Sequence, residues 1–328
     1  MALKRRKKEE MPKLSKEEQA RVDKFVEYLF LAFIILAVIC TIIVYKTKNP
    51  GMATDYMNSA TVEGYYENSF KPYKSLDVTH LNYDVDDLNY EIYFPDDIVG
   101  KENQDKYPLI IFANSNKFKC KDIKPVMAHL ASYGFVCVGN NGENYNGDDL
   151  KKVIDHLKYL SDEDVESIFY QKIDKEKIGL YGTYDGAVNA VKLYEKLDDS
   201  SLRINYLVLS CLPKEESLEK LKLEKYDLSK VYSNTFLISS DNSKLKKVLD
   251  TDDAFSKLTH ALTKIKATRN NIKLSSMLSY QDPYMTAYFM CFMKNDEEAR
   301  KIFYDSDEKA EITGFSGEWY NVEIDLGM

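Results

Sequence analysis

The fold of this chain is decided by the stretch Lys177-Ile-Gly-Leu-Tyr-Gly-Thr-Tyr-Asp-Gly-Ala-Val-Asn-Ala190. A short apolar strand over 178–181 runs into Gly182, three residues follow, and a helix begins at Gly186. The two glycines allow the helix to pack closely on the strand, and they hold the central residue, Tyr184, in a strained and exposed conformation. The pattern predicts a strand–turn–helix unit with one side chain at its tip.

The segments around this unit alternate between two patterns. Residues 107–114, 135–139, 206–211 and 235–240 are apolar runs typical of buried strands. Between them, segments with a single apolar face, such as 148–157, predict helices. Alternating strands and helices predict an α/β domain with a mostly parallel sheet and helices on both faces.

The two ends of this domain show other signals. Residues 78–84 and 88–94 alternate with a period of two, which predicts an antiparallel pair at the edge of the sheet. Asp282-Pro283 predicts the start of a last helix. The tail around Trp319 is predicted to be an edge segment or a flap.

The charge of the chain is unevenly distributed. At 328 residues and 44% apolar content, the chain can form one domain of about 270 residues plus an appendage. Residues 1–48 carry 11 Lys and Arg against 6 Asp and Glu, which leaves 34 against 47, a net −13, for residues 49–328. A basic share confined to one arm argues against a nucleic-acid surface on the main domain.

Cysteine and histidine residues are few and dispersed. The five cysteines contain no Cys-x-x-Cys pair and do not form a disulfide framework, although a pairing of Cys120 with Cys291 stays open. The four histidines are scattered. We therefore expect neither a metal site nor a cofactor.

The N-terminal region predicts a membrane anchor. Residues 28–45 contain 18 residues without a charge, and extension of this run predicts a single transmembrane helix over 25–46. Nine Lys and Arg precede it, so the positive-inside rule makes residues 1–24 a basic cytoplasmic arm and places the main domain outside the cell. Residues 47–75 are predicted to be a tether to an extracytoplasmic domain over 76–328.

Two alternatives compete with a signal-anchor, that is, a retained N-terminal transmembrane helix. A cleaved signal peptide would use Gly51-Met-Ala53 as its cleavage site, but the basic region is long and this site lies well beyond the apolar run. A buried soluble helix is disfavoured because the run is apolar on every face. We therefore expect a single-pass protein of the cell membrane.

Several segments carry a resemblance to a known family. Residues 107–114, 128–140, 169–174 and 178–182 resemble α/β-hydrolases of the dienelactone-hydrolase, chlorophyllase and polyester-hydrolase type. A late run from Met277 resembles the C-terminal part of bacterial and archaeal members. The similarity covers most of residues 75–328. It implies an α/β-hydrolase fold and an esterase whose nucleophilic serine lies in a Gly-x-Ser-x-Gly elbow, completed by an aspartate and a histidine.

The triad that this resemblance implies is degenerate. Tyr184 stands where the serine belongs, and a phenol with a pKa near ~10 is a weak nucleophile without a partner. Leu274 occupies the histidine position, and no histidine follows His260. Asp241 stands at about the acid position, where it has no imidazole to orient. His80, His129 and His156 fall on predicted strands or helices.

The neighbouring positions also depart from the family. The elbow of this chain consists of Gly182, Thr183, Tyr184, Asp185 and Gly186, and Thr183 is expected to point away from the site of attack. Asp185 would place a negative charge beside a developing oxyanion. The oxyanion loop reads Asn114-Ser115-Asn116-Lys117, where relatives have a glycine-dependent turn.

Three hypotheses about function follow. The first is a pseudoenzyme on a membrane stalk that binds a small molecule, a cell-wall component or a protein outside the cell. The second is an active ester hydrolase with Thr183 or Tyr184 as nucleophile and Asp185 or Asp241 as its partner. The third is a structural or interaction domain in which the ring of Tyr184 plugs the old pocket.

Overall fold

The computed structural model describes residues 15, 21–34, 64–74, 76–99, 105–303 and 314–327. The chain divides into two compact units, residues 1–53 and 54–328, and each is considered by itself. In the first unit, residues 21–34 are helical. None of the described helices combines the length and the apolar character needed to span a membrane. Residues 35–46 of the predicted span over 25–46 lie outside the described residues.

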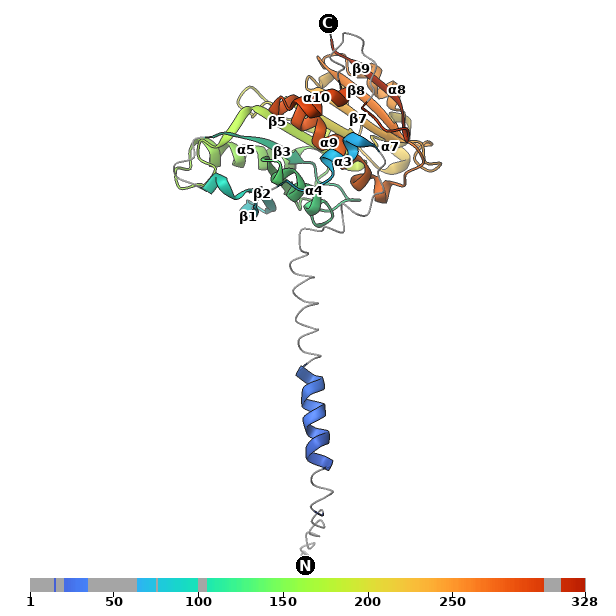
Figure 1. Ribbon diagram of the computed structural model, residues 1–328. Coiled ribbons are helices and arrows are strands. Elements are labelled where there is room, and N and C mark those ends of the chain that lie inside the picture. Colours follow the sequence, from blue (N-terminus) through green and yellow to red (C-terminus); the bar gives the residue numbers. More distant parts are fainter. Residues whose placement is uncertain are drawn as a thin grey trace, which may run out of the picture. The chain divides into compact units, whose positions relative to one another are not determined.

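The second unit is an α/β domain built on one sheet (Figure 1). The strands of this sheet are β1 (Val78–Val85), β2 (Leu88–Pro95), β3 (Tyr107–Phe112), β4 (Val136–Asn140), β5 (Ile173–Thr183), β6 (Tyr206–Ser210), β7 (Asn234–Ser240), β8 (Lys264–Arg269) and β9 (Trp319–Asp325). Their order across the sheet is β1-β2-β4-β3-β5-β6-β7-β8-β9. The pairs from β4 to β8 are parallel, and antiparallel pairs lie only at the two edges. The predicted mostly parallel sheet is confirmed.

Helices cover both faces of this sheet (Figure 1). The helices are α3 (Tyr65–Phe70), α4 (Cys120–Ser132), α5 (Asp148–Asp162), α6 (Asp185–Leu193), α7 (Glu215–Leu221), α8 (Thr251–Lys257), α9 (Leu274–Lys294) and α10 (Glu297–Phe303), with short 3-10 helices η1 (Asp96–Val99) and η2 (Leu228–Lys230). Successive strand residues face opposite sides. Thus Leu109 and Ile111 pack in one cluster with α5, α6, α7 and α8, and Ile110 and Phe112 pack in the other with α3, α4, α9 and α10.

The edge predictions agree with the structure at both ends of the sheet. Strands β1 and β2 form the expected antiparallel hairpin, with Val85 opposite Leu88. Trp319 begins β9, which pairs antiparallel with β8. The C-terminal tail is therefore an edge strand.

The predicted start of the last helix at Asp282-Pro283 is wrong. Helix α9 begins at Leu274, and Pro283 lies inside it. An Asp-Pro pair is a common signal for the first turn of a helix. Here Asp282 does not cap a helix, because its carboxylate is fully buried against His129 of helix α4. Tertiary pairing thus overrides the local signal.

Residues 64–74 of the predicted tether pack onto the domain. Helix α3 lies against α9. The buried carboxylate of Glu67 accepts hydrogen bonds from Trp319 Nε1 at 2.9 Å and from Ser316 Oγ at 3.1 Å. The N-terminal part of this unit is therefore joined to its C-terminal strand. Residues 47–63 lie outside the described residues.

Candidate functional site

Tyr184 is the single residue between strand β5 and helix α6. Its backbone has φ 53° and ψ −113°, a conformation that non-glycine residues adopt rarely, at a cost of about 1–3 kcal/mol. Such strain persists only where the surrounding structure fixes it. The Tyr184 N–H donates to the carbonyl oxygen of Ser210 at 2.9 Å, so the neighbouring strand β6 holds the bend. The chain therefore makes a sharp turn at this residue.

The two glycines that flank the turn lie where a side chain would press against the backbone, with a collision at Gly182 and a tight contact at Gly186. A Cβ on Gly182 would lie 2.4 Å from the carbonyl oxygen of Gly186 and 2.8 Å from Ala187 Cα. A Cβ on Gly186 would lie 3.1 Å from the carbonyl oxygen of Ala113. Strand β5, helix α6 and the end of β3 therefore pack closely, with backbone against backbone at the two glycines.

A cavity of about 340 Å³ lies over Tyr184. It brings Tyr184 together with Leu274, the first residue of α9, although the two are far apart in the sequence. The loops that follow β3, β5, β7 and β8 contribute its lining residues, so the cavity lies at the carboxyl ends of these parallel strands. Ligands of parallel sheets usually bind at this end. The lining residues are Lys117, Tyr184, Asn242, Lys244, Leu245, Val248, Lys273, Leu274 and Ser275.

Asp241 lies beside this cavity and does not line it. Its Oδ1 accepts a hydrogen bond from the backbone N–H of Asn271 at 2.6 Å, which joins the loop after β7 to the loop after β8. Asp241 faces a neighbouring open groove, and the next residue, Asn242, reaches the cavity instead. Of the three positions predicted for a triad, Tyr184 and Leu274 therefore lie together in one cavity, whereas Asp241 connects two loops.

The carboxylate of Asp185 is buried in the loop that follows β3. It accepts a hydrogen bond from Ser115 Oγ at 2.5 Å and another from the backbone N–H of Asn116 at 2.7 Å. Ser115 Oγ in turn accepts from the N–H groups of Lys117 and Phe118, each at 3.0 Å. The N–H groups of Asn116, Lys117 and Phe118, within and directly after the expected oxyanion loop, are therefore hydrogen-bonded within the protein.

Removal of the Asp185 carboxylate should weaken this loop. In Asp185→Ala, the buried Ser115 hydroxyl and the Asn116 N–H lose their acceptor, so we expect the free energy of unfolding to fall by about 2 kcal/mol. Urea unfolding of the full-length protein measures the change. Asp155→Ala serves as the control, because Asp155 pairs with Lys151 at 2.6 Å on the exposed face of α5 and should contribute less than about 0.5 kcal/mol. Equal effects in the two variants would contradict the structural role of Asp185.

A buried amide network fixes the same loop from the other side. Asn114 Nδ2 donates to the carbonyl oxygens of Gly142 at 2.8 Å and Asn144 at 3.2 Å. Asn189 on α6 donates to Asn114 Oδ1 at 2.8 Å, and its own Oδ1 accepts from the N–H of Gly147 at 2.7 Å. Sequence reasoning missed Asn189, although an asparagine among the apolar residues of a buried helix was a usable signal. The network therefore fixes the start of the loop from which Lys117 reaches the cavity.

The phenol of Tyr184 is poorly suited to nucleophilic attack. Burial raises its pKa above the ordinary value, and the nearby Asp185 and Cys211 add to the shift. The phenol therefore stays protonated at neutral pH, and within the described part of the chain no group accepts its proton through a hydrogen bond. An unactivated neutral phenol is a weak nucleophile.

The histidines of the chain have partners elsewhere, and none lines the cavity. Their contacts are His80 stacked on Tyr93, His129 Nδ1 at 3.0 Å from Asp282, His156 Nδ1 at 2.7 Å from Tyr90 Oη, and His260 Nδ1 at 2.6 Å from the carbonyl oxygen of Ser229. An imidazole base for Tyr184 is therefore not available from any of the four.

Two other potential nucleophiles lie beneath the turn. Thr183 is buried at the end of β5 and does not line the cavity. Cys211 follows β6 and is also buried, and this burial raises the pKa of its thiol to about 12. Neither side chain is placed to attack a bound molecule.

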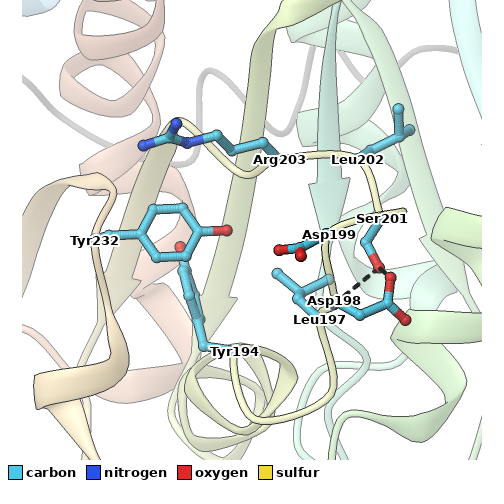
Figure 2. A pocket seen from close by; sticks show the side chains of 8 residues that line it. All are labelled: Tyr194, Leu197, Asp198, Asp199, Ser201, Leu202, Arg203 and Tyr232. Carbon is cyan, nitrogen blue, oxygen red and sulfur yellow. Dashed lines mark hydrogen bonds between the residues drawn. The ribbon is translucent and has the colours of Figure 1, made fainter.

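A second cavity, of about 380 Å³, lies at the amino ends of the parallel strands (Figure 2). It is formed at the end of α6 and just before β6 and β7, and the Arg203 guanidinium lies 5.2 Å from the centre of the Tyr232 ring. Figure 2 shows the two tyrosine rings facing the loop that carries Asp198 and Asp199. Ser201 Oγ donates to Asp198 Oδ1 at 3.2 Å, but both side chains belong to one exposed turn. The amino ends of parallel strands are also not the usual binding edge. The cavity over Tyr184 is the stronger candidate.

Comparison with known proteins does not assign this site. No model of a known protein family matches the chain, and no curated protein is significantly similar to it. Among the described residues, no three His, Cys, Asp or Glu side chains gather where they could hold a metal ion. Function is therefore inferred from the geometry around Tyr184.

Proposed function

We propose that the protein is a membrane-anchored, catalytically inactive member of the α/β-hydrolase superfamily that binds a ligand in the cavity over Tyr184. The relative positions of the elbow and of the loop after β3 support membership of this superfamily. In that family the residue after the nucleophile and the loop after the third strand form the oxyanion hole. Here Asp185 contacts Ser115 and Asn116 of the corresponding loop. The triad positions follow in the family's chain order, at Tyr184, Asp241 and Leu274.

One observation carries the proposal of inactivity. The strained elbow position holds a protonated phenol from which no base among the described residues accepts a hydrogen bond, and the four histidines have other partners. Loss of one triad member already leaves a serine hydrolase with only residual activity. The alternative hydrolase with Asp185 as partner is disfavoured, because both oxygens of that carboxylate accept hydrogen bonds from the loop after β3.

The volume over Tyr184 favours binding over a plugged scaffold. A cavity of about 340 Å³ falls within the range of small-molecule sites, roughly 300–1,000 Å³. The Tyr184 ring is half-buried and packs on one side of this space without filling it. A ligand of the size of a bicyclic aromatic compound is compatible with the cavity.

The N-terminal region supports attachment to a membrane. The described part of the predicted span is helical, and its apolar side chains are exposed, with Phe25 at 65%, Phe30 at 66% and Phe33 at 67%. Exposed apolar side chains along a helix are stabilised by lipid rather than by water. With nine basic residues before residue 25, the proposed orientation places the α/β domain outside the cell.

Two measurements on the full-length protein in lipid nanodiscs test this function. We expect no hydrolysis of short p-nitrophenyl esters above the buffer rate and no labelling by a fluorophosphonate, with a serine esterase as positive control. Turnover that is lost in Tyr184→Phe would overturn the proposal of inactivity.

Binding is tested with naphthamide, a neutral aromatic probe, with empty nanodiscs as the blank. We expect saturable binding that weakens at least about tenfold in Leu274→Trp, because the larger ring fills the cavity. The matched control is Leu262→Trp, since Leu262 is 71% exposed and lies outside the cavity lining. Equal affinity in both variants would show that the probe does not occupy this cavity.

A further inference from the structure

Three lysines surround the cavity over Tyr184. Lys117 comes from the loop after β3, Lys244 from the turn after β7, and Lys273 directly precedes α9. All three are exposed, and no carboxylate is among the residues that line the cavity. In the part of the chain that the structure describes, none of them forms an ion pair.

This arrangement stands out in an acidic domain. Residues 49–328 carry a net charge of −13, and several other surface lysines have acidic partners: Lys151 lies 2.6 Å from Asp155, and Lys257 lies 2.8 Å from Asp253. Two carboxylates close in sequence to the lining lie outside it: Asp185 binds the loop after β3, and Asp241 binds the N–H of Asn271. The lining itself therefore has three lysines and no carboxylate, a local excess of positive charge that attracts an anion.

The N-terminus of helix α9 adds to the same field. Leu274 is the first residue of this 21-residue helix, which has neither a side-chain cap nor an acidic residue in its first turn. The first N–H groups of a helix lack partners within it and carry a partial positive charge. Helix α6 does not add to this field, because Asp185 places a carboxylate in its first turn.

The rest of the lining is largely apolar. Leu245, Val248 and Leu274 contribute aliphatic surface, and Tyr184 contributes its ring. We infer that the cavity binds an anionic amphiphile, with an apolar body on this floor and a carboxylate or phosphate group at the three lysines. This inference names the ligand class for the proposed binding function and rests on it.

Four probes that share a naphthyl body test the charge preference on the full-length protein in nanodiscs. Naphthoate and naphthyl phosphate are anionic, naphthamide is neutral, and naphthylmethylammonium is cationic. We expect at least one anion to bind about tenfold more tightly than naphthamide, because each exposed lysine contributes a modest attraction. The order of the two anions separates a carboxylate ligand from a phosphate ligand. The preference should shrink at high salt.

Charge reversal of the rim provides the decisive comparison. The triple variant Lys117→Glu, Lys244→Glu and Lys273→Glu should lose the preference for the anionic probes over naphthamide. The control reverses three exposed lysines outside the cavity, Lys220, Lys225 and Lys230, and changes the net charge by the same amount. Naphthamide binding without an anion preference would overturn this inference and leave the proposed function intact. Absence of binding by every probe would overturn both, and a preference for naphthylmethylammonium would overturn the inference directly.

Discussion

Replacement of Asp282 by alanine should lower the free energy of unfolding by about 4 kcal/mol, the largest effect of any single change considered for this protein. The side chains of Asp282 and His129 are both fully buried, and Asp282 Oδ2 lies 3.0 Å from His129 Nδ1. Thr286 Oγ1 donates to the other carboxylate oxygen at 3.2 Å. Removal of the carboxylate leaves the buried His129 ring without its partner, and the loss of one member of a buried pair is strongly destabilising.

The same pair connects three segments of the domain. His129 lies on α4 and Asp282 on α9, and His129 Nε2 lies 3.2 Å from the carbonyl oxygen of Pro72. Tyr133 Oη donates to that same carbonyl oxygen at 3.0 Å, and Tyr73 Oη donates to a carbonyl oxygen of α4 at 3.0 Å. Loss of Asp282 should therefore also loosen residues 71–74, which hydrogen exchange would detect.

The stability change is measured by urea unfolding of the full-length protein, with fluorescence of Trp319, the one tryptophan of the chain, as the probe. The double variant His129→Leu with Asp282→Ala provides the internal control. Because it removes both partners, it should cost less than the sum of the two single changes. A loss below about 1 kcal/mol for Asp282→Ala would contradict a stabilising contact between the two buried side chains.

The parallel core of the fold was readable in the sequence because its signals are local. Continuous apolar runs such as 107–112 predict buried strands without reference to any other segment. Strand β8 was not predicted, because charged residues interrupt its apolar pattern. The structure shows why they are tolerated: Lys266 is 7% exposed and lies 2.6 Å from Asp252 and 2.7 Å from Glu323. These partners come from α8 and β9, so no local pattern reveals the pairing.

Some residues of the candidate site could likewise be predicted from the sequence, and others could not. The positions of Tyr184 and Leu274 follow from motif spacing and resemblance, and the structure places both in one cavity. The lysine rim was not predicted, because Lys117, Lys244 and Lys273 come together only through the crossovers of the sheet. Likewise, Asp185 was expected to face a reacting oxyanion, whereas its carboxylate binds the loop after β3. Motif spacing therefore located two residues of the cavity, whereas the lysines and the contacts of Asp185 depend on the tertiary structure.

Introduction of a single methyl group at Gly182 should destabilise the protein by about 3 kcal/mol. The added Cβ would lie 2.4 Å from the carbonyl oxygen of Gly186 and 2.8 Å from Ala187 Cα. Both are backbone atoms at the start of α6, so no side-chain rotation relieves the contact. Helix α6 must then move away from β5, which disturbs the strained conformation at Tyr184 and the cavity above it. We therefore expect naphthamide binding to weaken together with stability.

Gly317→Ala is the matched control for this change, because no atom lies within 4 Å of the added Cβ and the residue is exposed. An alanine in place of a glycine also restricts the unfolded chain, which stabilises a protein by about 0.4–1 kcal/mol where the backbone permits it. Gly317→Ala should therefore be neutral or slightly stabilising in the same urea experiment. Because both variants carry the same entropic gain, their difference isolates the steric contact between β5 and α6. A small difference would mean that strand and helix can separate freely, and the turn at Tyr184 would then not be held by close backbone packing.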